Sequence, residues 1–154
     1  MKSRTLKSGA RRIGVILFED TDLLDTAGPA RVFHSAANQL LRTGAAAEPP
    51  YAIDFLSKEG GLVSTSLGFR LETQPVRELA PGDYDTIIVS GGGVEDAHCD
   101  PEIVAWLQRN HSHARRVGST CTGAFVLASA GLLDGRRAAT HWAYCDALQA
   151  SFPN

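Results

Sequence analysis

Cysteine is scarce in this sequence of 154 residues, which has three, and no two of them form a C-x-x-C pair. An odd, sparse set argues against a disulfide framework and fits a reducing compartment, so we expect a cytoplasmic protein. No apolar run approaches the roughly 18 residues that a membrane span needs, so we expect no membrane contact. Positive charge is not in excess either. The formal net charge of −2 excludes a strongly basic nucleic-acid domain, because phosphate binding needs clustered Lys and Arg.

The composition is that of one ordinary globular domain. Hydrophobic residues make up 44% and charged residues 21% of the chain, which is neither disordered nor fibrous. The length provides for one hydrophobic core. The first twelve residues carry five basic side chains and no acid. We therefore expect residues 1–11 to be a flexible basic tail, with a nucleic-acid arm as the alternative, and residues 12–154 to be the domain.

Predicted strands alternate with predicted helices along the chain. Continuous apolar or alternating runs indicate strands at 13–18, 51–57, 85–90 and 116–120, with short strands at 62–65, 69–73 and 138–140. Helices are indicated from Gly28-Pro29 to Leu40, from Asp100-Pro101 onward, over 122–130, and around Trp142, Cys145 and Leu148, which would share a buried face. This order predicts an α/β fold with a mostly parallel sheet. Sites in such sheets lie beyond the carboxyl ends of strands, here 19–28, 90–94 and 119–123.

Ser119-Thr120-Cys121-Thr122-Gly123 has the pattern of a nucleophile elbow, in which small residues flank a nucleophile between a strand and a helix. The helix dipole and free N–H groups at such a turn favour a thiolate, so we expect Cys121 to have a lowered pKa and to be the most reactive cysteine. The alternative is an inert cysteine buried at the junction.

Gly91-Gly92-Gly93 follows a predicted buried strand directly. Glycines let backbone N–H groups approach a ligand closely, and with the Thr122 N–H they would form an oxyanion hole facing Cys121. The alternative is a glycine turn that only allows a tight bend. The G-x-G-x-x-G spacing of a dinucleotide site is absent, and we expect no cofactor.

Asp25 differs from the other acids near it, Glu19, Asp20 and Asp22, because apolar residues surround it. Such a carboxyl tends toward a raised pKa and serves as a proton donor or base. It would alternatively, or also, cap the helix predicted to begin at Gly28.

Histidine offers few catalytic partners. His98, His111 and His113 stand in loops or at helix ends, where we expect exposure, and His34 lies on the first predicted helix. Only His141 stands near a predicted strand end. No H-E-x-x-H motif occurs, so we expect no metal site. Cys99 and Cys145 are interpreted as a surface thiol and a core residue, respectively.

Several segments together resemble one superfamily. They are Leu23-Leu24-Asp25-Thr26-Ala27-Gly28-Pro29, Ile88-Val89-Ser90-Gly91-Gly92, Cys121-Thr122-Gly123-Ala124, the run 130–138, and Thr140-His141-Trp142. In this order they resemble the PfpI/ThiJ superfamily, which has a class I glutamine amidotransferase-like fold. The resemblance implies a flavodoxin-like three-layer α/β/α sandwich and a homodimer.

Two branches of that superfamily share these motifs. The resemblance to the sensor domain of AraC-type transcription regulators implies a small-molecule ligand near Cys121, with Gly91, Gly92, Gly93, Gly123 and His141 around it. DNA would then be bound only by a separate helix-turn-helix domain. The resemblance to isocyanide hydratase implies Cys121 as nucleophile, Asp25 as acid and base, and Thr122 in support. Tyr51 to Gly68 and Trp142 to Pro153 look more like the regulator branch.

Two features depart from the superfamily pattern. Thr122 stands where a superfamily protease has histidine, which argues against proteolysis. The chain also stops at Asn154, before a final strand and helix that the superfamily would supply, and it has no helix-turn-helix segment. We therefore expect a shortened chain that has no DNA binding of its own.

Overall fold

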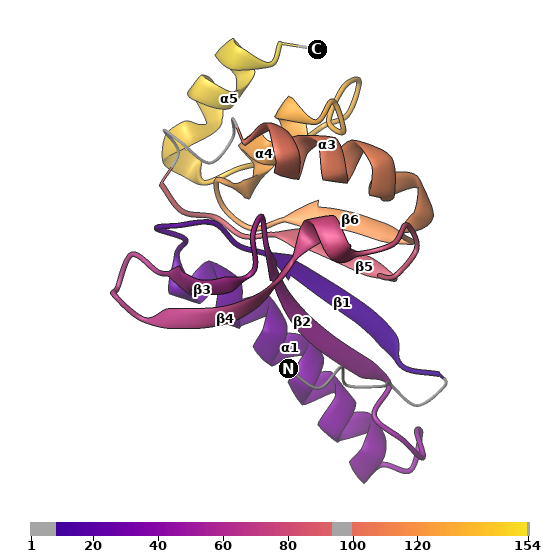
Figure 1. The fold of residues 1–154 in the computed structure, drawn as a ribbon. Coiled ribbons are helices and arrows are strands. Elements are labelled where there is room, and N and C mark those ends of the chain that lie inside the picture. The colour runs from indigo at the N-terminus through magenta and orange to yellow at the C-terminus, as the bar shows by residue number, and fades with distance from the viewer. Residues whose placement is uncertain (1–8, 94–99, 154) are drawn as a thin grey trace.

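The structure, a computed structural model, describes residues 9–93 and 100–153 (Figure 1). Its sheet has the strand order β3-β4-β2-β1-β5-β6. The strands are β1 (Arg11–Ile16), β2 (Tyr51–Ser57), β3 (Gly61–Ser64), β4 (Arg70–Pro75), β5 (Thr86–Val89) and β6 (Arg116–Ser119). Neighbouring strands are parallel except for β3 and β4, which are antiparallel. The predicted mostly parallel sheet is thus confirmed.

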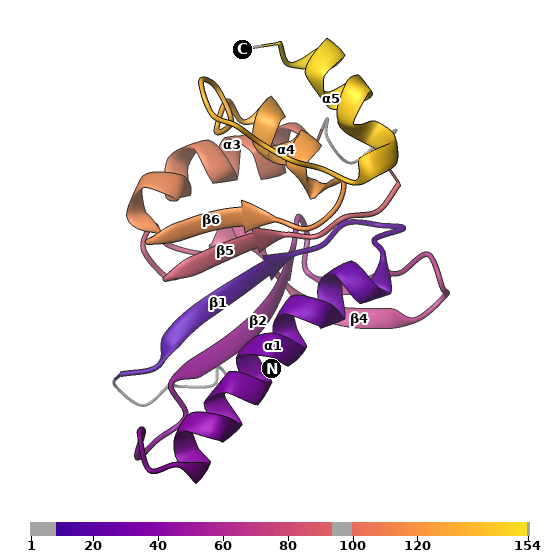
Figure 2. The same cartoon turned by 180° about the vertical axis from the view of Figure 1, so that it is seen from behind.

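Helices cover both faces of this sheet. They are α1 (Leu23–Arg42), α3 (Pro101–Asn110), α4 (Gly123–Ser129) and α5 (Cys145–Ser151), with 3-10 turns η1 (Val76–Glu78), η2 (His111–His113) and η3 (Trp142–Tyr144). Figure 2 shows α1 lying across β1 and β2, whereas α3 and α4 lie over β5 and β6. The three-layer α/β/α arrangement predicted from the sequence is therefore confirmed.

Strand alternation sorts the core residues between the two layers. Ile16, Leu56 and Val89 point toward α3 and α4 and pack with Trp106 and Leu107. Val15 and Leu17 point to the opposite face, where they pack with residues of β2, β3 and β4. Three β1 side chains, Ile13, Val15 and Ile16, are fully buried, and so is Leu17 directly after the strand. This burial explains why the run lacks the alternation of a strand with one exposed face.

The first helix begins five residues earlier than the sequence predicts. Asp22 caps α1 by accepting hydrogen bonds from the backbone N–H groups of Leu24 and Asp25, at 2.8 and 3.2 Å. Pro29 therefore lies inside the helix rather than in its first turn. Asp25 belongs to the first turn and is not the cap. The prediction that the helix opens at Gly28-Pro29 is wrong.

Other boundaries differ near the ends of the chain. The run 138–140 forms no strand. Trp142 is 83% exposed and Cys145 is exposed too, so only Leu148 of the predicted apolar face is buried. Cys145 is therefore not a core residue. Strand β1 takes in Arg11, which was assigned to the tail, and residues 1–8 lie outside the described residues.

Removing the cap of α1 should destabilise the fold. Asp22→Ala leaves two backbone N–H groups without their acceptor and is expected to lower the free energy of unfolding by about 1 kcal/mol. Asp22→Asn keeps a capping oxygen and is expected to stay within a few tenths of the wild type. Urea denaturation compares the three proteins. Equal losses in both variants would contradict a capping role.

Candidate functional site

Three strand ends converge at one edge of the sheet. The register aligns Ile16 of β1 with Val89 of β5, and Val89 with Ser119 of β6. The residues that follow these strands therefore meet, and Asp22 donates its backbone N–H to the Gly91 carbonyl at 2.9 Å. Strand β1 is also where the strand order reverses, with β2 on one side and β5 on the other. The three segments singled out in the sequence come together as predicted.

Cys121 occupies a sharp turn between β6 and α4. Its backbone has φ +48°, in the left-handed region that side chains other than glycine adopt only under constraint. Thr122 then forms the N-cap of α4. The predicted elbow geometry is confirmed, and the turn places Cys121 beside Asp25 in the first turn of α1.

Neighbouring atoms approach Gly91 and Gly123 so closely that neither position has room for a Cβ atom. A Cβ on Gly123 would stand 2.5 Å from the Val89 carbonyl oxygen and 2.6 Å from that of Ser90. A Cβ on Gly91 would meet an Asp25 carboxylate oxygen at 2.3 Å and Cys121 Cβ at 2.7 Å. Gly91 thus lies in close contact with both Asp25 and Cys121. Gly123 packs against the end of β5, so it allows α4 to approach the sheet closely.

Asp25 and Cys121 form a hydrogen-bonded pair. Burial raises the pKa of the Asp25 carboxyl, and this effect outweighs the hydrogen bond from Cys121, which lowers it. Burial also raises the pKa of the Cys121 thiol, and the neighbouring Asp25 adds to that rise. The Thr122 N–H at the start of α4 lowers the thiol pKa but does not prevail. The predicted raised pKa of Asp25 is confirmed, and the predicted lowered pKa of Cys121 is wrong.

The Thr122 side chain joins the elbow to the glycine loop. Its hydroxyl accepts from the Gly92 N–H and donates to the Gly92 carbonyl, both at 2.9 Å. The Thr122 N–H is itself hydrogen-bonded to Cys121. Two of the N–H groups expected to form an oxyanion hole are therefore already engaged in this structure.

A cleft of about 340 Å³ opens above the pair. It is lined by Asp20, Asp22, Leu24, Asp25, Ser66, Gly92, Gly93, Cys121, Thr122, His141 and Tyr144. His141 lies close enough to lower the pKa of Asp25 by its charge. The sequence did not indicate Ser66, which the β3–β4 turn supplies, or Tyr144, which lies two residues beyond the motif Thr140-His141-Trp142. Among the residues that the structure describes, the lining includes three aspartates and no Lys or Arg.

A buried cluster of hydroxyls fixes the start of α1 to the end of β5. Thr26 and Ser90 are hydrogen-bonded through their hydroxyls at 2.8 Å. Thr21 donates to the Gly91 carbonyl at 2.8 Å and lies 3.1 Å from the Ser90 hydroxyl. All three are fully buried. A satisfied polar network of this kind holds neighbouring groups in one arrangement. Threonine and serine are too common in turns for the sequence to reveal it.

Among the described residues, the remaining histidines and cysteines do not line this cleft. His111 and His113 are exposed, as predicted, and His34 is an exposed residue of α1. Cys99 and His98 lie outside the described residues. No group of three His, Cys, Asp or Glu side chains suited to a metal ion occurs within residues 9–93 and 100–153. No helix in the same part of the chain is both long enough and apolar enough to cross a membrane.

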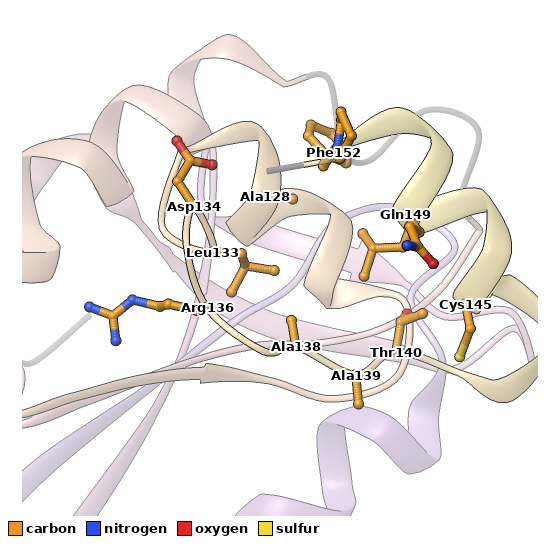
Figure 3. A pocket seen from close by; sticks show the side chains of 12 residues that line it. Ala128, Leu133, Asp134, Arg136, Ala138, Ala139, Thr140, Cys145, Gln149 and Phe152 are labelled. Atoms are coloured by element: carbon orange, nitrogen blue, oxygen red, sulfur yellow. The ribbon is translucent and has the colours of Figure 1, made fainter.

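A second groove of about 360 Å³ lies between α4, α5 and the loop that joins them (Figure 3). The run 138–140, predicted as a strand, instead lines this groove together with Leu133 and Cys145. Thr140 connects the groove to the elbow, because its hydroxyl donates to the Cys121 carbonyl at 3.0 Å.

The raised pKa of Asp25 makes stability depend on pH. A folded-state pKa above the unfolded value stabilises the fold fully below the unfolded pKa, and that contribution is lost as pH rises through the folded pKa. Asn cannot titrate. We therefore expect Asp25→Asn to gain stability relative to the wild type between pH 3.5 and pH 7. Urea denaturation of both proteins at both pH values measures their unfolding free energies. The same difference between the two proteins at both pH values would contradict the raised pKa.

A mostly parallel sheet between helices, with a cysteine at a left-handed turn between a strand and a helix, defines a flavodoxin-like α/β/α class with a cysteine elbow. Within that class, the chain belongs to the DJ-1/PfpI family, whose pattern it matches over residues 11–152.

Relatives in this family differ in function. The chain is 36% identical to an uncharacterized protein from the cpoL 5' region of Streptomyces lividans, covering 97% of this chain and 100% of the relative. It is 36% identical to isonitrile hydratase of Pseudomonas putida, over 90% of this chain and 56% of the enzyme. It is 33% identical to the HTH-type transcriptional regulator GbdR of Pseudomonas aeruginosa, over 92% of this chain and 36% of the regulator. The chain therefore spans about half of the enzyme and about a third of the regulator.

Solved structures agree with this placement. A ThiJ/PfpI family protein from Pseudomonas syringae superposes with a TM-score of 0.77 at 26% identity, covering 94% of this chain and 55% of that one. An AraC family transcriptional regulator from Pseudomonas putida gives 0.72 at 25% identity, covering 93% of this chain and 73% of that one. The domain is thus related both to regulator domains and to isonitrile hydratase.

Proposed function

We propose that this domain is the ligand-sensing domain of an AraC-type transcription regulator and binds a small molecule beside Cys121. The observation that carries the proposal is the open cleft of about 340 Å³ that Cys121 and Asp25 line together. Burial and Asp25 both raise the pKa of Cys121, which disfavours the thiolate that attacks electrophiles. A protonated thiol and a carboxyl serve a binding site as hydrogen-bonding groups.

The relatives support this proposal in a second way. The domain corresponds to about a third of GbdR, and the regulator's remaining length is available for other domains. In this proposal DNA is contacted by a separate helix-turn-helix domain, and the sensing domain pairs with a second copy of itself in the cytoplasm. Ligand binding near Cys121 would then be passed to the DNA-binding part.

Thermal-shift measurements on the 154-residue chain test the sensor proposal. A panel of amino acids, amines and organic acids at millimolar concentration is expected to contain compounds that raise the melting temperature. Ser66→Trp fills the cleft from the β3–β4 turn and should abolish those shifts. Ser112→Trp lies on η2, at the opposite end of β6, and should keep them. Shifts that survive Ser66→Trp, or a panel without any shift, would contradict the proposal.

A second candidate is an isonitrile hydratase-like activity, which the hydrogen-bonded Asp25–Cys121 pair favours. The pair shares a proton. Moving it from sulfur to the carboxylate gives a thiolate and an adjacent acid at once, so a raised thiol pKa does not forbid catalysis.

The reaction would follow from those two groups. The thiolate attacks the terminal carbon of the isonitrile and the Asp25 carboxyl protonates that carbon, which gives a thioimidate on Cys121. The Asp25 carboxylate then activates a water that adds to the carbon. Asp25 passes the proton that it took from water to the nitrogen. The carbon–sulfur bond then breaks, Cys121 leaves as the thiolate, and Asp25 takes the hydroxyl proton, which releases the N-formamide and restores the starting pair. NMR detection of the formamide from cyclohexyl isocyanide distinguishes this candidate, because a sensor yields none.

A further inference from the structure

Pro29 leaves a gap in the hydrogen bonding of α1 at the residue that matters most for the site. In an α-helix the N–H of residue 29 would donate to the carbonyl of residue 25, but proline has no N–H. Pro29 lies inside α1, so the Asp25 carbonyl has no donor from that position. Leaving a half-buried carbonyl unpaired is costly, so another donor is expected nearby.

That donor comes from Thr120, the residue that directly follows β6. The Thr120 hydroxyl donates to the Asp25 carbonyl oxygen at 3.2 Å, across 95 residues of sequence. The same hydroxyl lies 3.5 Å from the Val89 carbonyl, which already accepts the Thr120 N–H at 3.0 Å. The hydroxyl is therefore available for Asp25. Because Thr120 immediately precedes Cys121, this bond connects the backbone of the acid directly to the turn that holds the thiol.

The Asp25 backbone is consequently fixed at both ends. Its N–H donates to the Asp22 side chain at 3.2 Å, and its carbonyl accepts from Thr120. Gly91 lies beneath the carboxyl, where even a methyl group would not fit. Because its backbone is hydrogen-bonded on both sides and Gly91 packs against its carboxyl, the Asp25 side chain has little freedom to move away from Cys121.

We propose that Thr120 is a positioning residue, whose hydroxyl replaces the helical donor removed by Pro29 and holds the Asp25 carboxyl against Cys121. This deepens the proposed function, because it concerns the same Asp25–Cys121 pair that faces the cleft. It holds for a sensor and for an enzyme alike, since both need the acid and the thiol in contact.

Alkylation of Cys121 tests the inference without any ligand. Iodoacetamide labelling is followed between pH 6 and pH 10, and peptide mapping isolates the peptide that contains Cys121. Asp25 suppresses thiolate formation at Cys121, so loosening the pair should speed labelling. Thr120→Val keeps the shape but removes the hydroxyl, and it is expected to label about 3-fold faster than wild type at pH 8. Thr120→Ser keeps the hydroxyl and should restore the wild-type profile.

A double-variant cycle separates positioning from a local effect of Thr120. Asp25→Asn removes the charge and should speed labelling at least as much as Thr120→Val. The double variant Thr120→Val/Asp25→Asn is expected to match Asp25→Asn alone. If Thr120→Val speeds labelling equally in the presence and absence of the Asp25 carboxyl, or if Thr120→Ser behaves as Thr120→Val, the inference is overturned. Failure of ligand binding in the thermal-shift assay would leave this result untouched and would count only against the sensor proposal.

Discussion

Gly123→Ala is expected to lower the free energy of unfolding by about 3 kcal/mol or more. The added Cβ would stand 2.5 and 2.6 Å from the carbonyl oxygens of Val89 and Ser90. Both atoms belong to the backbone at the end of β5, so no side-chain rotation relieves the contact. Either α4 moves away from the sheet or β5 bends, and each change opens the core that α4 forms with β5.

Gly118→Ala is the matched control for this prediction. Gly118 lies in the neighbouring strand β6, and a Cβ there would meet nothing within 4 Å. It should therefore change the unfolding free energy by no more than about 0.5 kcal/mol. Urea denaturation of the two variants gives the comparison. Similar stabilities would mean that the elbow does not pack against the sheet in the way described.

The strands and the site's location could be predicted because they depend on local patterns. A strand buried on both faces needs a continuous apolar run, and Ile13 to Leu17 provides one. Asp100 before Pro101 predicted the start of α3 correctly, since a capping carboxylate and a proline in the first turn act within one turn. The elbow around Cys121 was predictable for the same reason.

The start of α1 was not predictable from the same signals. Pro29 favours a helix start locally, and the acids before it offer several capping groups. The contact that allows proline inside the helix is made by Thr120, which is 95 residues from Asp25 in sequence. A tertiary hydrogen bond therefore overrides a local signal here, and it does so beside the functional cleft.

The thiol pKa illustrates a different limit. The sequence places Cys121 at the start of a helix, and the N–H of Thr122 does lower the pKa of the thiol. Burial and the carboxyl of Asp25 act in the opposite direction and prevail. The direction of the pKa shift is thus set by three effects: burial, Asp25 and the Thr122 N–H. Burial and the approach of Asp25 arise only once the sheet has assembled.

The other large effect concerns the Asp25 carboxyl in turnover of an isonitrile. Asp25→Asn is expected to slow formamide formation by the 154-residue chain about 10²–10⁴-fold, because Asn can neither protonate the isonitrile carbon nor activate water. Asp20→Asn is the matched control, since Asp20 lines the same cleft and its backbone has φ +62°, which Asn tolerates. That variant removes a charge of equal size while leaving the Asp25–Cys121 contact in place. NMR quantification of the formamide compares the three proteins.

Full turnover by Asp25→Asn, or an equal loss in Asp20→Asn, would exclude Asp25 as the acid and base. A wild-type chain that forms no formamide while binding a ligand that Ser66→Trp excludes would remove the enzyme candidate and support the sensor.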